Sequence, residues 1–134
     1  MNILFALIPK EKVAYIYDYF TVRQVLEKME YHRYSSIPII NRSGKYIGTI
    51  SEGDLLWYIK NNHDLDFRKA EEIPILSVPR KHDNYGIYVN TKMDDLITAA
   101  AQQNFIPVLD DSDTFIGIVT RKDIINYLQE KKGS

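Results

Sequence analysis

One pattern of residues occurs twice in this chain, and both copies keep the same internal spacing. Each copy has an apolar–proline–apolar run, a short polar turn, a glycine-containing apolar run, a hydroxyl residue and, three positions later, an aspartate. The second copy follows the first by 69 residues throughout, as its landmarks show: Pro38, Gly48, Ser51 and Asp54, then Pro107, Gly117, Thr120 and Asp123. A repeat of this regularity predicts two copies of one supersecondary unit.

The same order of secondary-structure elements is predicted around each copy. A run of β-branched and aromatic residues, at 13–17 and again at 85–89, indicates a strand. Thr21 or Thr91 follows this run and opens a capping-box pattern before a helix with apolar residues at helical spacing. Two strands joined by a tight polar turn come next, and a second helix starts at the hydroxyl residue. We therefore expect an α/β (α+β) fold with two β-α-β-β-α repeats.

The repeat also divides the chain along its length. We predict that residues 1–60 form the first repeat, 61–72 a polar connector and 73–134 the second repeat. The apolar opening at 3–9 is much shorter than the roughly 20 residues of a membrane helix and lacks a basic stretch before it. We expect this opening to pack as part of the fold.

Composition argues against several classes of function. The 134 residues carry 17 basic and 18 acidic side chains, so we expect no general basic surface for DNA or for a membrane. The absence of cysteine excludes disulfides, thiolate catalysis and cysteine metal sites, and it fits a cytoplasmic protein. The histidines lack metal-ligand spacing, and the acidic turn at 110–113 lacks the closing glutamate of an EF-hand. Because no nucleophile–base set is evident either, we do not expect an enzyme.

The residues that could bind a ligand lie where the second strand of each hairpin leads into a helix. Glycine inside a strand often marks the close approach of another group. The hydroxyl residue is placed at a helix start, where free N–H groups favour anions, and the aspartate one turn later can accept hydrogen bonds from a ribose diol. The isoleucine–proline pair offers an apolar slot for a purine. The two nucleotide sites predicted in this way contain Ile37, Pro38, Ser51 and Asp54, and Ile106, Pro107, Thr120 and Asp123.

The two predicted sites differ in charge. Arg121 and Lys122 stand between hydroxyl and aspartate in the second copy, where the first copy has Glu52 and Gly53. Cations at a helix start favour phosphate and a carboxylate opposes it, so Arg121 and Lys122 join the second site, which we expect to bind phosphorylated ligands more tightly. The basic residues before the first strands could also reach a phosphate, although a solvated loop is the preferred interpretation: Lys10, Lys12, Arg80, Lys81 and His82.

A simpler interpretation exists for each motif alone. Ser-x-x-Asp and Thr-x-x-Asp are also plain capping boxes, and most capping boxes have no further role. The repetition of the motif together with the strand glycines Gly48 and Gly117 favours a binding site.

The pattern apolar-Pro-apolar, turn, Gly-x-x-Ser/Thr-x-x-Asp resembles the CBS (cystathionine β-synthase) domain, and its tandem occurrence resembles a CBS pair, or Bateman module. The resemblance covers nearly the whole chain. It implies two repeats related by a pseudo-twofold axis, with clefts between them that bind an adenine nucleotide: AMP, ADP, ATP, S-adenosylmethionine or cyclic di-AMP. Such a ligand would be regulatory rather than a catalytic cofactor.

The resemblance further implies a non-catalytic regulatory module that forms a homodimer and signals to a protein partner that the sequence does not name. Trp57 and Tyr58 are candidate helix-packing or dimer contacts. A structural or dimerisation module whose clefts stay empty is the alternative.

Overall fold

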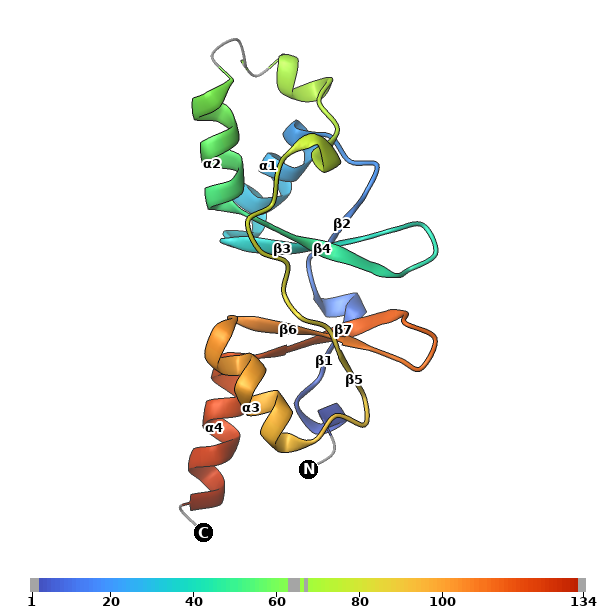
Figure 1. Ribbon diagram of the computed structural model, residues 1–134, viewed down its shortest axis with the longest axis vertical. Coiled ribbons are helices and arrows are strands. Elements are labelled where there is room, and N and C mark those ends of the chain that lie inside the picture. Colours follow the sequence, from blue (N-terminus) through green and yellow to red (C-terminus); the bar gives the residue numbers. More distant parts are fainter. Residues whose placement is uncertain (1–2, 63–65, 67, 133–134) are drawn as a thin grey trace. The chain divides into compact units, whose positions relative to one another are not determined.

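The computed structural model of the chain describes residues 3–62, 66 and 68–132. Contacts divide it into two compact units (Figure 1). Unit 2 comprises residues 14–83, and unit 1 comprises the residues up to Val13 together with those from Asn84 onward. Among the described residues, no helix is both long and apolar enough to cross a membrane.

Unit 2 is a three-stranded sheet with two helices. Its elements in chain order are β2 (Ile16–Tyr17), α1 (Val22–His32), β3 (Ser36–Ile40), β4 (Tyr46–Ser51), α2 (Glu52–Asn61) and the 3-10 helices η3 (Lys69–Glu71) and η4 (Ile75–Ser77). The strand order is β2-β3-β4, with β2 parallel to β3 and β3 antiparallel to β4. The core is formed by aliphatic side chains from the sheet, both helices and η4, with Ile16, Ile37, Ile39, Ile50 and Ile75 fully buried.

Unit 1 repeats this arrangement and adds a strand. Its elements are η1 (Ile3–Ala6), β1 (Ile8–Pro9), η2 (Lys10–Lys12), β5 (Ile87–Tyr88), α3 (Met93–Gln102), β6 (Phe105–Leu109), β7 (Phe115–Thr120) and α4 (Arg121–Lys132). The strand order is β1-β7-β6-β5, with β5 parallel to β6 and the other pairs antiparallel. The expected β-α-β-β-α order is thus confirmed in both halves, although the first strand of each, β2 or β5, has only two residues.

The compact units do not coincide with the sequence repeats. The apolar opening packs with the second repeat: Ile3 is 2% exposed in the core of unit 1, and β1 pairs with β7. The start of the second repeat packs with the first: the Ile75 N–H donates to the Phe20 carbonyl (2.8 Å), and the Val22 N–H donates to the Ile73 carbonyl (2.9 Å). Each unit therefore includes the opening segment of the other repeat. Part of the predicted connector, 63–65 and 67, lies outside the described residues.

Local sequence chemistry explains most helix starts. Thr21 forms the expected capping box with Gln24 at the start of α1. The same expectation for Thr91 is wrong, because α3 begins one residue later, after Lys92, without a side-chain cap. The Thr91 hydroxyl instead accepts the Tyr88 N–H (3.1 Å) and so closes the turn that follows β5.

Candidate functional site

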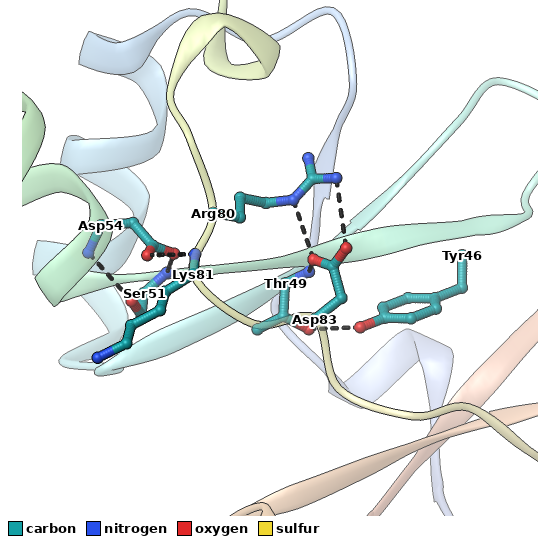
Figure 2. A network of polar contacts seen from close by, with 7 residues as sticks. All are labelled: Tyr46, Thr49, Ser51, Asp54, Arg80, Lys81 and Asp83. Carbon is teal, nitrogen blue, oxygen red and sulfur yellow. Dashed lines mark hydrogen bonds and ion pairs between the residues drawn. The ribbon is translucent and has the colours of Figure 1, made fainter.

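The junction of β4 and α2 carries the predicted hydroxyl–aspartate pair of the first repeat. Ser51 is the N-cap of α2: its Oγ accepts the Asp54 N–H (3.1 Å), and Asp54 Oδ2 accepts the Ser51 N–H (3.0 Å). Asp54 is only 7% exposed, and its Oδ1 accepts a hydrogen bond from the Lys81 N–H (3.0 Å). Figure 2 shows these contacts and the neighbouring polar groups. Both carboxylate oxygens of Asp54 therefore already have partners within unit 2.

The glycine of this strand does mark a close approach, and the approaching group is the chain itself. A Cβ on Gly48 would overlap the Asp83 carboxylate and lie 3.0 Å from Arg80 Cζ. Asp83 Oδ1 accepts the Thr49 N–H (2.9 Å) beside this glycine, and it also pairs with Arg80 Nε (2.9 Å). The missing side chain therefore makes room for a carboxylate that is hydrogen-bonded to the strand (Figure 2).

Arg80 and Lys81 lie in the segment expected to be a solvated loop, and of the two Arg80 is partly buried. The Arg80 side chain is 20% exposed and ion-paired, while Lys81 is exposed apart from its backbone contact with Asp54. Both line a cavity of about 390 Å³ that is bounded by α2 and the segment after η4: Asp54, Trp57, Tyr58, Asn61, Asn62, Ser77, Pro79, Arg80 and Lys81. A cavity of this size is within the range of small-molecule sites. It combines two cations with the carboxylate of Asp54.

Glu52 lines a different hollow. That hollow, about 490 Å³, lies between α1 and α2 and is bounded by Leu26, Met29, Glu30, Arg33, Glu52, Leu55, Leu56 and Ile59. The residue after the N-cap thus lies on the α1 side of α2, whereas Asp54 lines the cavity. An effect of the Glu52 charge on a phosphate at Asp54 stays a prediction.

At the corresponding junction in unit 1, from β7 into α4, the aspartate has fewer hydrogen-bond partners among the described residues. Thr120 Oγ1 accepts the Asp123 N–H (3.1 Å), as the repeat predicts. Asp123 is half-buried, and its carboxylate has no hydrogen bond or ion pair within the described part of the chain. Asp123 is thus free to accept from a ligand where Asp54 is already engaged.

The two cations expected at this junction, Arg121 and Lys122, have different surroundings. Arg121 Nε donates to the Ala100 carbonyl at 2.6 Å, so the guanidinium is held against the end of α3. Lys122 is exposed. Contact of either residue with a phosphate stays a prediction. The bond to Ala100 uses the Nε–H of Arg121 and does not exclude such a contact, because the guanidinium has four further N–H donors.

Gly117 is the strand glycine of unit 1 that corresponds to Gly48, and a different group approaches it. A Cβ at this position would overlap the Ile8 carbonyl oxygen of β1, and the residue has φ +154°, a value that L side chains rarely adopt. Backbone, rather than a carboxylate, covers this strand in unit 1.

The predicted apolar slots are parts of the sheets. Ile37 and Ile106 are fully buried in the two cores, and Pro38 and Pro107, opposite Thr49 and Ile118, are buried in strand pairs. These four side chains serve packing, and their contact with a purine stays a prediction.

The acidic turn of unit 1 is held by its own backbone. Asp110 Oδ1 accepts the N–H groups of Ser112 and Thr114, each at 2.9 Å. Asp113 accepts the Tyr88 hydroxyl, and this hydrogen bond raises the pKa of Tyr88 because it stabilises the protonated phenol. No cluster with metal-ligand composition occurs among the described residues.

Comparison with known proteins agrees with the repeated geometry. The sequence model of the CBS domain matches the chain twice, over residues 6–61 and 80–130. The chain belongs to the CBS domain family. Each match covers one of the two repeats, and each repeat contains a hydroxyl–aspartate motif at a helix start.

Two relatives and one solved structure are similar to this chain over most of its length. An uncharacterized protein of Methanocaldococcus jannaschii is 23% identical over 90% of this chain and 47% of its own length. The gamma subunit of the 5'-AMP-activated protein kinase of Saccharomyces cerevisiae is 31% identical over 80% of this chain and 34% of its own length. The chain thus spans less than half of either relative. A crystal structure of CbpB in complex with c-di-AMP is 27% identical, with a TM-score of 0.84 over 97% of this chain and 85% of that one.

Sequence reasoning did not identify Asp83, and it placed Arg80, which is ion-paired and 20% exposed, in a solvated loop. One signal was present: Gly48 in a strand requires a group that approaches it. Nothing in the spacing shows which group that is, because Asp83 lies 35 residues further along the chain.

Proposed function

We propose that this CBS pair is a non-catalytic regulatory module that binds an adenine nucleotide at the helix starts of its repeats and signals to a protein partner. The observation that carries the proposal is the cavity beside Asp54, where a capped helix start, a carboxylate and two cations meet. The solved complex of CbpB with c-di-AMP and the name of the yeast kinase subunit support an adenine ligand.

Each group at the first site has a part in this proposal. Asp54 accepts hydrogen bonds from the ribose diol, since charged acceptors make the stronger hydrogen bonds. Arg80 and Lys81 attract the phosphate, and the start of α2 adds the partial positive charge of a helix N-terminus. These cations favour phosphorylated ligands such as AMP, ADP, ATP or cyclic di-AMP over S-adenosylmethionine, whose sulfonium is itself positive.

The second site uses Thr120 and Asp123, with Lys122 as the exposed cation. The Asp123 carboxylate needs to give up no partner within the described chain, whereas Asp54 must share or release the Lys81 N–H. We therefore propose that the second site binds AMP more tightly, on this ground rather than on the charge of Glu52. A cytoplasmic location and a homodimer belong to the same proposal.

The alternative function is a dimerisation module whose sites stay empty. The hollow between α1 and α2 favours it, because the apolar side chains of Leu56 and Ile59 beside it are 59% and 40% exposed.

Isothermal calorimetry and thermal melting with AMP, ATP, S-adenosylmethionine and cyclic di-AMP test the proposal. A ligand at about 100 times its dissociation constant stabilises the folded state by about 2.7 kcal/mol, which raises the melting temperature. If none of these compounds at millimolar concentration produces binding heat or a shift, the dimerisation module is the better interpretation.

A further inference from the structure

The segment from Pro79 to Asp83, here called the strap, is held on unit 2 at two points. At one point, its Lys81 N–H donates to Asp54 Oδ1. At the other, its Asp83 carboxylate accepts the Thr49 N–H of β4 and pairs with Arg80. Figure 2 shows the strap passing across β4 between these two points.

Both attachment points use groups that a nucleotide needs. Asp54 is the acceptor proposed for the ribose diol, and the strap occupies one of its oxygens. Arg80 is the half-buried cation proposed for phosphate, and Asp83 already neutralises it. The strap thus satisfies internally the donors and acceptors that an anionic ribonucleotide would otherwise satisfy.

We propose that the strap occupies the binding groups of the first site in the free protein and that an anionic ribonucleotide displaces it from them. The inference rests on the proposed function and adds its regulation. The diol displaces the Lys81 N–H from Asp54, and the phosphate displaces Asp83 from Arg80. Asp83 then leaves the space above Gly48 and releases the Thr49 N–H.

The strengths of the contacts agree with this exchange. The Arg80–Asp83 pair is partly exposed, with the Asp83 side chain 42% accessible, and exposed ion pairs contribute little net stability. A phosphate carries more charge than a carboxylate and presents more acceptor oxygens to the guanidinium. The strap is therefore held firmly enough to be ordered and weakly enough to be displaced.

The segment of unit 1 that corresponds to the strap lacks a carboxylate at the position of Asp83. Pro9 and Lys10 correspond to Pro79 and Arg80 of the repeat, and the position that corresponds to Asp83 is occupied by Val13. There, the backbone of β1 covers Gly117 through ladder pairing. The strap also ends where the chain passes from unit 2 into unit 1. Its release changes the conformation of a segment that joins the two units, which links ligand binding to the rest of the chain.

Amide hydrogen exchange of the full chain, measured by NMR with AMP as the probe, tests the strap. In the free protein, the amides of Lys81 and Thr49 are expected to exchange slowly. Saturating AMP should speed exchange at both amides, although ligands generally slow exchange near their site. Adenosine has the diol without the phosphate and should speed exchange at Lys81 alone. Unchanged or slower exchange at both amides with bound AMP would contradict the proposed displacement of the strap.

Asp83→Asn provides the matching affinity measurement. The amide can still accept the Thr49 N–H but no longer neutralises Arg80, so AMP should bind the first site two- to fivefold more tightly, equivalent to about 0.4–1 kcal/mol. Asp111→Asn makes the same change at an exposed position in unit 1 and should leave the affinity unchanged. Gly48→Ala, whose methyl group pushes Asp83 away, should act in the same direction as Asp83→Asn.

Failure of the strap is distinguishable from failure of the proposed function. If wild-type protein shows no AMP binding, the proposed function falls. If the wild-type protein binds AMP while Asp83→Asn and Gly48→Ala have unchanged or weaker affinity, the proposed displacement of the strap is wrong. The proposed nucleotide binding is then still supported.

Discussion

Gly48 and Gly117 are the same residue at the same place in the repeat, yet their surroundings differ. The space at Gly48 is taken by the ends of two flexible side chains, Asp83 and Arg80. The space at Gly117 is taken by the Ile8 carbonyl oxygen, and the backbone there has positive φ. The first glycine therefore permits a movable group, whereas the second is required by the fold.

Alanine substitutions should separate these two glycines. We expect Gly117→Ala to lower the free energy of unfolding by about 1–3 kcal/mol, because the new Cβ meets backbone and the residue must keep an unfavourable φ. Gly48→Ala should lower it by less, since only side-chain ends need to move. Urea denaturation of the two variants measures the difference, and equal losses would contradict this view of the glycines.

The two aspartates should also respond differently to alanine. Asp54→Ala removes an acceptor from the Ser51 and Lys81 N–H groups, so we expect it to lower the free energy of unfolding by about 1–3 kcal/mol. Asp123→Ala removes no such contact and should change stability by less than about 0.5 kcal/mol. In calorimetry, Asp123→Ala should weaken AMP binding about tenfold or more, and Asp54→Ala should cost less because the first site is the weaker one. The reverse order would refute the assignment of the tighter site.

At the scale of elements, α2 has two sides with separate roles. Its N-terminus and one side, with Asp54 and Trp57, border the cavity, and the other side, with Glu52, Leu56 and Ile59, borders the hollow against α1. Apolar residues this exposed are typical of interaction surfaces when they are contiguous. We therefore place the proposed dimer contact on the α1–α2 side.

Light scattering at tens of micromolar should show a dimer of this chain. Leu56→Arg, which puts a charge into the proposed contact, should raise the dimer dissociation constant at least about tenfold. Leu76→Arg is the matched control, because Leu76 is also an exposed leucine of unit 2, at 49%, but lies outside this hollow. A monomeric wild type, or equal effects of the two substitutions, would count against this surface.

At the scale of the whole molecule, the exchange of segments makes each unit depend on distant parts of the chain. The core of unit 1 needs Ile3, and its sheet needs β1 as a partner of β7. The core of unit 2 needs Ile75 and Val78, which belong to the start of the second repeat. A cut between the repeats at the connector would therefore leave both halves incomplete.

Deletion of residues 1–12 should destabilise unit 1 selectively. Loss of the buried Ile3 side chain alone corresponds to about 1.5–3 kcal/mol, and the edge of β7 loses its ladder bonds as well. Hydrogen exchange should become faster in β7, at Ile118 above all, while β4 amides keep their protection. Unchanged exchange in β7 would show that the segment does not support this unit.

The sequence alone determined what depends on neighbours three or four residues apart. The repeat, the order of elements, the hairpins and the capping boxes of Thr21 and Ser51 all follow from short-range hydrogen bonds and side-chain periodicity. The hydroxyl–aspartate contacts of Ser51 with Asp54 and of Thr120 with Asp123 belong to the same class. Even here a tight turn changed the outcome, since Thr91 caps no helix.

Only the tertiary structure decided which groups meet across long stretches of chain. Asp83 reaches Thr49, Lys81 reaches Asp54, and β1 pairs with β7 more than 100 residues away. Such contacts depend on how buried surfaces pack and on which edge of a sheet is left open, and residue spacing encodes neither. The same packing turned Arg121 toward Ala100 and placed Glu52 on the α1 side of α2, because a side chain on a helix faces whichever element covers that side.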